Sequence, residues 1–156
     1  MKYYIGVDPG KPPRGGLALV KEGLAVEYEP MPGTVKGIKS WLEFVNYRAF
    51  SEKDQVVMVI EKAQVFPGNG AVGMFNYGKH YGAFEALAVA LDIPYHEVNQ
   101  GVWKKAMGLT KEKALSIVLC ERLFPTVNLL FPRCTKKSDH VAEAILLAEY
   151  GRRLNL

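Results

Sequence analysis

The sequence feature that most constrains the fold is an unbroken apolar run, Val56-Val57-Met58-Val59-Ile60. Its length and β-branched residues predict a strand, and its lack of alternation predicts that both faces of the strand are buried. Such strands usually lie in the middle of a sheet, parallel to a neighbour, with helices covering both faces. Glu61 follows directly, and a carboxylate at the end of a buried strand is costly unless it is paired or binds a metal.

The segments around this strand predict an α/β fold with a mixed sheet. Residues 2–7, 17–21 and 24–29 have strand character, and the short turns between them predict an antiparallel meander. Helical spacing is expected over 35–50, 74–91 and 136–150, with a loop over 64–73, a short strand at 93–98 and helices within 100–107 and 110–123. We therefore expect a five-stranded mixed sheet flanked by helices, built as one domain over residues 1–156.

Composition favours a folded, soluble protein with a polyanionic partner. No apolar stretch approaches the roughly 18 residues of a membrane span, and a strand-like segment follows Met1 directly, so we expect no membrane contact and no signal peptide. Cys120 and Cys134 lack metal-ligand spacing, which indicates reduced core or near-core thiols of a cytoplasmic protein.

The net charge of +4 is unevenly distributed. Residues 1–98 carry ten basic and eleven acidic side chains, whereas residues 99–156 carry ten and five. A phosphate backbone is the commonest partner for such clustering, and ordinary solubilising surface is the alternative.

Four carboxylates lie where the predicted fold can bring them together. Asp8 and Glu61 each end an apolar strand, and if the two strands are parallel neighbours their ends lie side by side, with strand centres about 4.8 Å apart. Asp139 and Glu143 are four residues apart in a mostly apolar helix, so they share a face and repel each other. With no basic residue fixed among them, the four groups predict a two-metal site for Mg²⁺, which prefers carboxylate oxygen. The alternative is that Asp139 caps the helix and Glu143 faces solvent.

Four segments resemble one family, in the right order and along nearly the whole chain. Residues 5–10 (Ile-Gly-Val-Asp-Pro-Gly), 59–61 (Val-Ile-Glu), 74–83 and 139–146 are similar to the corresponding segments of RuvC-type Holliday junction resolvases, which have a ribonuclease H-like fold. The resemblance implies a homodimer that cuts two opposed strands of a four-way DNA junction, using Mg²⁺ or Mn²⁺. The chain resembles the short phage-type members more than the bacterial enzyme, which implies a cytoplasmic protein of a bacterial or phage-infected bacterial cell.

The last helix departs from the family pattern. Bacterial members commonly place the final ligands three residues apart; His140 and Glu143 have this spacing, whereas Asp139 and Glu143 are four apart. We favour Asp139 as the ligand because Mg²⁺ prefers oxygen to imidazole. His140 remains a candidate for the same position, for orienting water or for proton transfer.

Aromatic and basic side chains are candidates for DNA contact. Phe66, in the loop after Glu61, either stacks on junction bases or packs under its own loop. The resemblance assigns the first half of the long helix, with Tyr77, Lys79 and His80, to the dimer interface and the DNA channel. Trp103 is expected to be a core or half-buried anchor. The candidate phosphate contacts, with plain surface as the alternative for about half of them, are Lys104, Lys105, Lys111, Lys136 and Lys137.

The predicted chemistry is hydrolysis of a phosphodiester by two metal ions, which leaves 5′-phosphate and 3′-hydroxyl ends. One alternative is a nuclease of the same fold that acts on RNA–DNA hybrid or other branched DNA. Another is a non-catalytic nucleic-acid binding module. Clustered carboxylates argue against the binding module, because a protein that only binds phosphates gains nothing from them.

Overall fold

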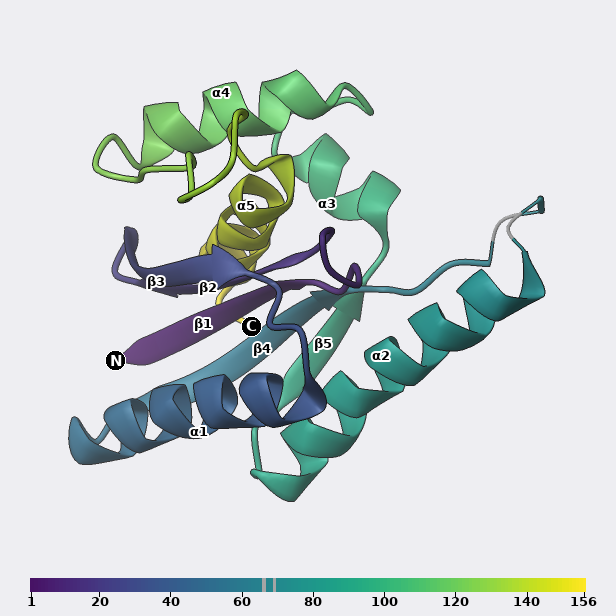
Figure 1. Cartoon of the computed structure of the whole chain (residues 1–156). Coiled ribbons are helices and arrows are strands. Elements are labelled where there is room, and N and C mark those ends of the chain that lie inside the picture. Colours follow the sequence, from purple (N-terminus) through teal and green to yellow (C-terminus); the bar gives the residue numbers. More distant parts are fainter. Residues whose placement is uncertain (66, 69) are drawn as a thin grey trace.

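A computed structural model describes residues 1–65, 67–68 and 70–156, and these residues contain a five-stranded sheet (Figure 1). The strand order is β3-β2-β1-β4-β5. β1 pairs antiparallel with β2 and β2 with β3, whereas β4 is parallel to both β1 and β5. The mixed sheet and the meander are therefore confirmed. The strands are β1 (Lys2–Asp8), β2 (Gly16–Lys21), β3 (Leu24–Pro30), β4 (Gln55–Glu61) and β5 (Tyr95–Val98).

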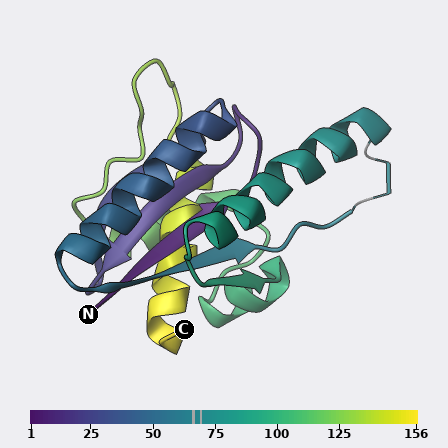
Figure 2. The same cartoon turned by 90° about the horizontal axis from the view of Figure 1, so that it is seen from below.

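Helices cover both faces of the sheet (Figures 1 and 2). α1 (Val35–Ser51) and α2 (Ala71–Ala90) lie on one face. α3 (Gln100–Ala106), α4 (Lys113–Leu123) and α5 (Asp139–Leu154) lie on the other. Alternate β4 side chains enter two separate cores: Val56, Met58 and Ile60 face α1 and α2, whereas Val57 and Val59 face α5. The prediction of a strand buried on both faces is confirmed.

The register of β1 against β4 determines where their terminal carboxylates lie. Val7 pairs with Ile60, so Asp8 and Glu61 are the next residues along two parallel neighbours. On the other side of β4, Glu61 pairs with Val98, the last residue of β5. The chain then turns at Asn99 into α3, which places that helix beside Glu61.

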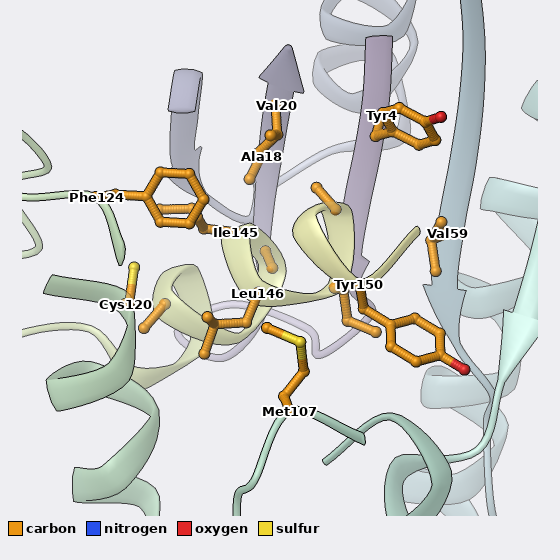
Figure 3. Close-up of a cluster of buried hydrophobic side chains, with 14 of the residues drawn as sticks. Tyr4, Ala18, Val20, Val59, Met107, Cys120, Phe124, Ile145, Leu146 and Tyr150 are labelled. Atoms are coloured by element: carbon orange, nitrogen blue, oxygen red, sulfur yellow. The ribbon is translucent and has the colours of Figure 1, made fainter. Parts of the chain in front are cut away.

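α5 forms the centre of one core. Every residue from Val141 to Gly151 is buried, and the apolar ones pack against β1, β2, β4 and α4 (Figure 3). The closest approach is at Gly6 of β1, where an added Cβ would lie 1.8 Å from the backbone oxygen of Ala144. Only glycine fits there, and this contact brings the end of β1 close to the start of α5.

α2 differs from its prediction in where it begins. It starts at Ala71, three residues before the predicted start, with Gly70 at the N-cap position. Its first half projects past the sheet (Figures 1 and 2) and exposes 74% of Val72 and 68% of Phe75. The expectation that both cysteines are near the core is also wrong for one of them: Cys120 is buried, but Cys134 is exposed in the segment before α5. Within the described residues, no helix combines the length and the apolar character needed to cross a membrane.

Candidate active site

Asp8 is held in place by the first residues of α5 and by its own turn. Its Oδ2 lies 2.8 Å from His140 Nδ1, and its Oδ1 accepts a 3.4 Å hydrogen bond from the Gly10 amide. The hydrogen bond to Asp8 is the main cause that raises the pKa of His140 above its ordinary value, with burial acting in the opposite direction. The Nδ1 atom of His140 thus points at the carboxylate of Asp8.

Glu61 receives hydrogen bonds from α3 on both carboxylate oxygens. Trp103 donates from Nε1 to Oε2 at 2.9 Å, and Gln100 donates from Nε2 to Oε1 at 3.2 Å. Burial raises the pKa of Glu61 to about 7, with Asp8 and Glu143 acting in the same direction and the Trp103 bond and Lys104 opposing them. The three carboxylates are therefore close enough to repel one another.

Glu143 is buried, with 6% of its surface exposed. Its Oε1 lies 2.6 Å from Lys104 Nζ and accepts a 3.1 Å hydrogen bond from Ser116 Oγ. The expectation that no basic residue is fixed among the carboxylates is therefore wrong. Lys104 is itself buried, and its ammonium group donates a hydrogen bond to Glu143 instead of facing solvent.

Asp139 is the first residue of α5 and is partly exposed. Its Oδ2 lies 3.3 Å from Lys113 Nζ at the start of α4. The helix cap is supplied by Ser138, whose Oγ accepts a 3.1 Å hydrogen bond from the Val141 amide. The alternative in which Asp139 caps and Glu143 faces solvent is therefore excluded on both counts.

All five predicted catalytic residues line one cavity of about 730 Å³. Tyr77 of α2 lines the same cavity, and its pKa is raised to about 12 by burial and by the charges of Glu61 and Asp8. The wall also carries five basic side chains: Lys11, Arg14, Lys104, Lys111 and Lys113. The cavity therefore combines an acidic floor, where Asp8 and Glu143 are buried, with a basic rim of four exposed residues, Lys11, Arg14, Lys111 and Lys113.

The metal site itself stays a prediction. In the part of the chain that the structure describes, no three His, Cys, Asp or Glu side chains already form a metal-ligating group. The donor set nevertheless fits a hard cation, because it consists mainly of carboxylate oxygens. Burial is the main cause of the raised pKa of Glu61, and the charges of Asp8 and Glu143 raise it further. A divalent cation between these groups would relieve their repulsion.

The other predicted DNA contacts are divided between this cavity and the surface. Tyr77, Lys104 and Lys111 line the cavity. His80 is half-buried, with its ring edge-on to Phe84 at 5.6 Å between centroids, and burial lowers its pKa. Phe66 lies outside the described residues. Four of the predicted contacts are exposed lysines outside the cavity lining: Lys79, Lys105, Lys136 and Lys137. Lys137 pairs with Glu121 at 2.5 Å.

Sequence reasoning missed the groups that hold the carboxylates. The expectation of a core position for Trp103 agrees with its full burial, but its role as a donor to Glu61 was not predicted. Gln100 and Ser116 carried no signal of their own. Helical spacing offered a partial clue, because Gln100 and Trp103 are three apart and so share a face of α3.

Comparisons with known proteins identify the fold. No family model and no curated protein matches the sequence. Solved structures match nearly the whole chain, and two of them are structures of RuvC. The first, Thermus thermophilus RuvC in complex with a Holliday junction substrate, has a TM-score of 0.66 and 16% identity, over 97% of this chain and 96% of that one. The second, Thermus thermophilus RuvC, has a TM-score of 0.63 and 17% identity, over 98% and 96%. The chain therefore has the ribonuclease H-like fold of RuvC.

Proposed function

We propose that this protein is a structure-selective DNA endonuclease that resolves four-way junctions by metal-dependent hydrolysis. The observation that carries the proposal is the convergence of Asp8, Glu61, Glu143 and the start of α5 on one basic-rimmed cavity. The similarity to a RuvC structure bound to a Holliday junction supports the choice of substrate.

Each site residue has a distinct part in the proposed reaction. Asp8, Glu61, Glu143 and Asp139 would hold two Mg²⁺ ions, with Mn²⁺ as a substitute, and the chemistry these supply is activation of water and stabilisation of the leaving 3′-oxygen. The products would carry 5′-phosphate and 3′-hydroxyl ends. His140 Nδ1 orients Asp8 and can carry a proton beside it.

The basic rim would bind the phosphates on either side of the scissile bond. Lys11, Lys111 and Lys113 are exposed residues of the cavity lining, so a phosphate can reach them, and Lys113 is also within 3.3 Å of Asp139. Phosphate contacts of this kind position a nucleic acid without reading its sequence. Lys104 acts differently, because its ammonium group is bound to Glu143.

Selectivity for a four-way junction requires two active sites at a fixed separation, because two strands are cut in one substrate. We propose that the chain forms a homodimer for this purpose. The exposed apolar side chains Val72 and Phe75, on the projecting half of α2, support an interface there.

The test is incubation of the protein and Mg²⁺ with a labelled synthetic junction, a matched linear duplex and an RNA–DNA hybrid. We expect paired, symmetric nicks in the junction alone, lost in Asp8→Asn and retained in Asp92→Asn, a matched change at an exposed turn residue. Cleavage of the RNA–DNA hybrid instead of the junction would indicate a ribonuclease of the same fold. Binding without cleavage, in either metal, would overturn the enzyme assignment.

A further inference from the structure

The carboxylate of Glu61 is unusual in the site because neutral groups hold both of its oxygens. Trp103 Nε1 and Gln100 Nε2 each donate to a different oxygen, at 2.9 and 3.2 Å. The other carboxylates contact charged or titratable partners instead: Asp8 contacts His140, Glu143 contacts Lys104, and Asp139 contacts Lys113. These two donors therefore orient Glu61 without supplying a charge.

The two donors stand on a rigid support. Trp103 is fully buried, and its ring packs in the α5-side core, which fixes the direction in which Nε1 points. The indole N–H can only donate, so Trp103 cannot be a metal ligand or transfer a proton. The face of its ring lies 5.5 Å from Lys104 Nζ, measured to the ring centroid. Trp103 is also absent from the described cavity lining, whereas Gln100 forms part of that lining. Trp103 thus donates its hydrogen bond to Glu61 from a buried position outside the cavity lining.

The arrangement leaves Glu61 free to bind a cation on its cavity side. Each ionised carboxylate oxygen offers about two acceptor positions, and each oxygen of Glu61 uses one of them for α3. The remaining acceptor positions are on Glu61, which lines the cavity and lies near enough to Asp8 for the charges of the two carboxylates to interact.

We propose that Trp103 and Gln100 are positioning residues that hold Glu61 in its metal-binding orientation. The inference rests on the proposed metal-dependent function. The competing explanation is that Trp103 is a core anchor whose N–H takes the nearest acceptor, with no effect on the site.

The test compares Trp103→Phe and Gln100→Met with the wild type and with Trp41→Phe. Phenylalanine keeps a buried ring at position 103 but removes the donor together with part of the ring volume. Trp41→Phe loses the same part of the ring at a partly buried position against the opposite core, so it serves as the control for lost volume. Mn²⁺ affinity is measured by calorimetry, and kcat and KM are measured on the junction. We expect Mn²⁺ binding to weaken about tenfold in Trp103→Phe, as for the loss of other groups that orient metal ligands. We also expect kcat to fall by a similar factor, with KM for the junction unchanged.

A spectroscopic measurement separates positioning from folding. The indole N–H signals of Trp41 and Trp103 are recorded by ¹H–¹⁵N NMR in the metal-free protein and after addition of Mg²⁺. We expect Mg²⁺, and separately Glu61→Gln, to move the Trp103 signal and to leave the Trp41 signal in place.

Two outcomes would overturn the inference: wild-type Mn²⁺ affinity and kcat in Trp103→Phe, whatever its melting temperature, or a wild type that binds no Mn²⁺ at all. Failure of the junction function gives a different pattern. In that case Trp103→Phe still binds Mn²⁺ more weakly than the wild type, but neither protein cuts the junction.

Discussion

Replacing Glu61 with Gln should change the stability of the metal-free protein by an amount that depends on pH. Measured against the wild type, the variant should be more stable at alkaline pH than at acidic pH, although the change removes a site residue. The folded protein has a Glu61 pKa of about 7, against 4.5 for an unperturbed side chain, chiefly because of burial. Between these two values the folded state binds more protons than the unfolded state. The contribution of Glu61 to stability therefore falls as pH rises from 4.5 to about 7, and stays low above that range.

The size of the effect follows from the shift. A change from 4.5 to about 7 corresponds to about 3 kcal/mol when the group is fully ionised. About 2.5 kcal/mol of this develops between roughly pH 5 and pH 8. For a chain of this size, each kcal/mol moves Tm by about 2–4 °C. The Tm of Glu61→Gln minus that of the wild type should thus be about 5–10 °C more positive at the higher pH.

The assay is thermal unfolding followed by circular dichroism, in EDTA, at both pH values. The amide introduced in place of the Glu61 carboxylate cannot accept from both Trp103 and Gln100, but that cost is nearly independent of pH and cancels in the comparison. Glu22→Gln, a change at an exposed residue, is the matched control and should show no such difference. An equal effect of Glu61→Gln at the two pH values would refute the reasoning.

Three further outcomes are expected. Lys104→Met leaves Glu143 charged and unpaired inside the protein, so the free energy of unfolding in urea should fall by about 3 kcal/mol, and the double variant Lys104→Met/Glu143→Met should recover most of it. His140→Asn should lower Tm more at pH 6 than at pH 9. The hydrogen bond to Asp8 raises the pKa of His140, so this contact stabilises the fold only while the ring is protonated. An equal loss of Tm at both pH values would contradict this. Gly6→Ala should lower the free energy of unfolding by about 3 kcal/mol, because its Cβ meets the backbone of α5; unchanged stability in urea would show that α5 can move away.

The sequence predicted the parts of the site that depend on local pattern. The apolar run ending in Glu61 located a central strand, and parallel pairing with the strand ending in Asp8 then placed the two carboxylates side by side. The spacing of Asp139 and Glu143 brought two further carboxylates onto one helix. These inferences succeeded because strand and helix periods leave a direct record in the order of residues.

The partners of the carboxylates could not be predicted in the same way. Trp103 is 42 residues from Glu61, and Lys104 is 39 from Glu143, so no periodic pattern joins either pair. A lysine in a basic stretch indicates surface, because burial of an ammonium group becomes acceptable only once its distant partner is known. The early start of α2 was missed because Gly73 is a poor helix former whose local preference the rest of the helix overrides.

The position of α5 in chain order has a consequence for biosynthesis. β1 and β4 can pair while the polypeptide is still being made, but the sheet face that carries Ala18, Val57 and Val59 stays uncovered until α5 has been synthesised. The same helix brings Asp139, His140 and Glu143 to the site. A ribosome-bound chain that has not yet released α5 therefore exposes an apolar sheet face and lacks the side chains that α5 brings to the candidate site, so it is prone to aggregation until this helix packs against the sheet.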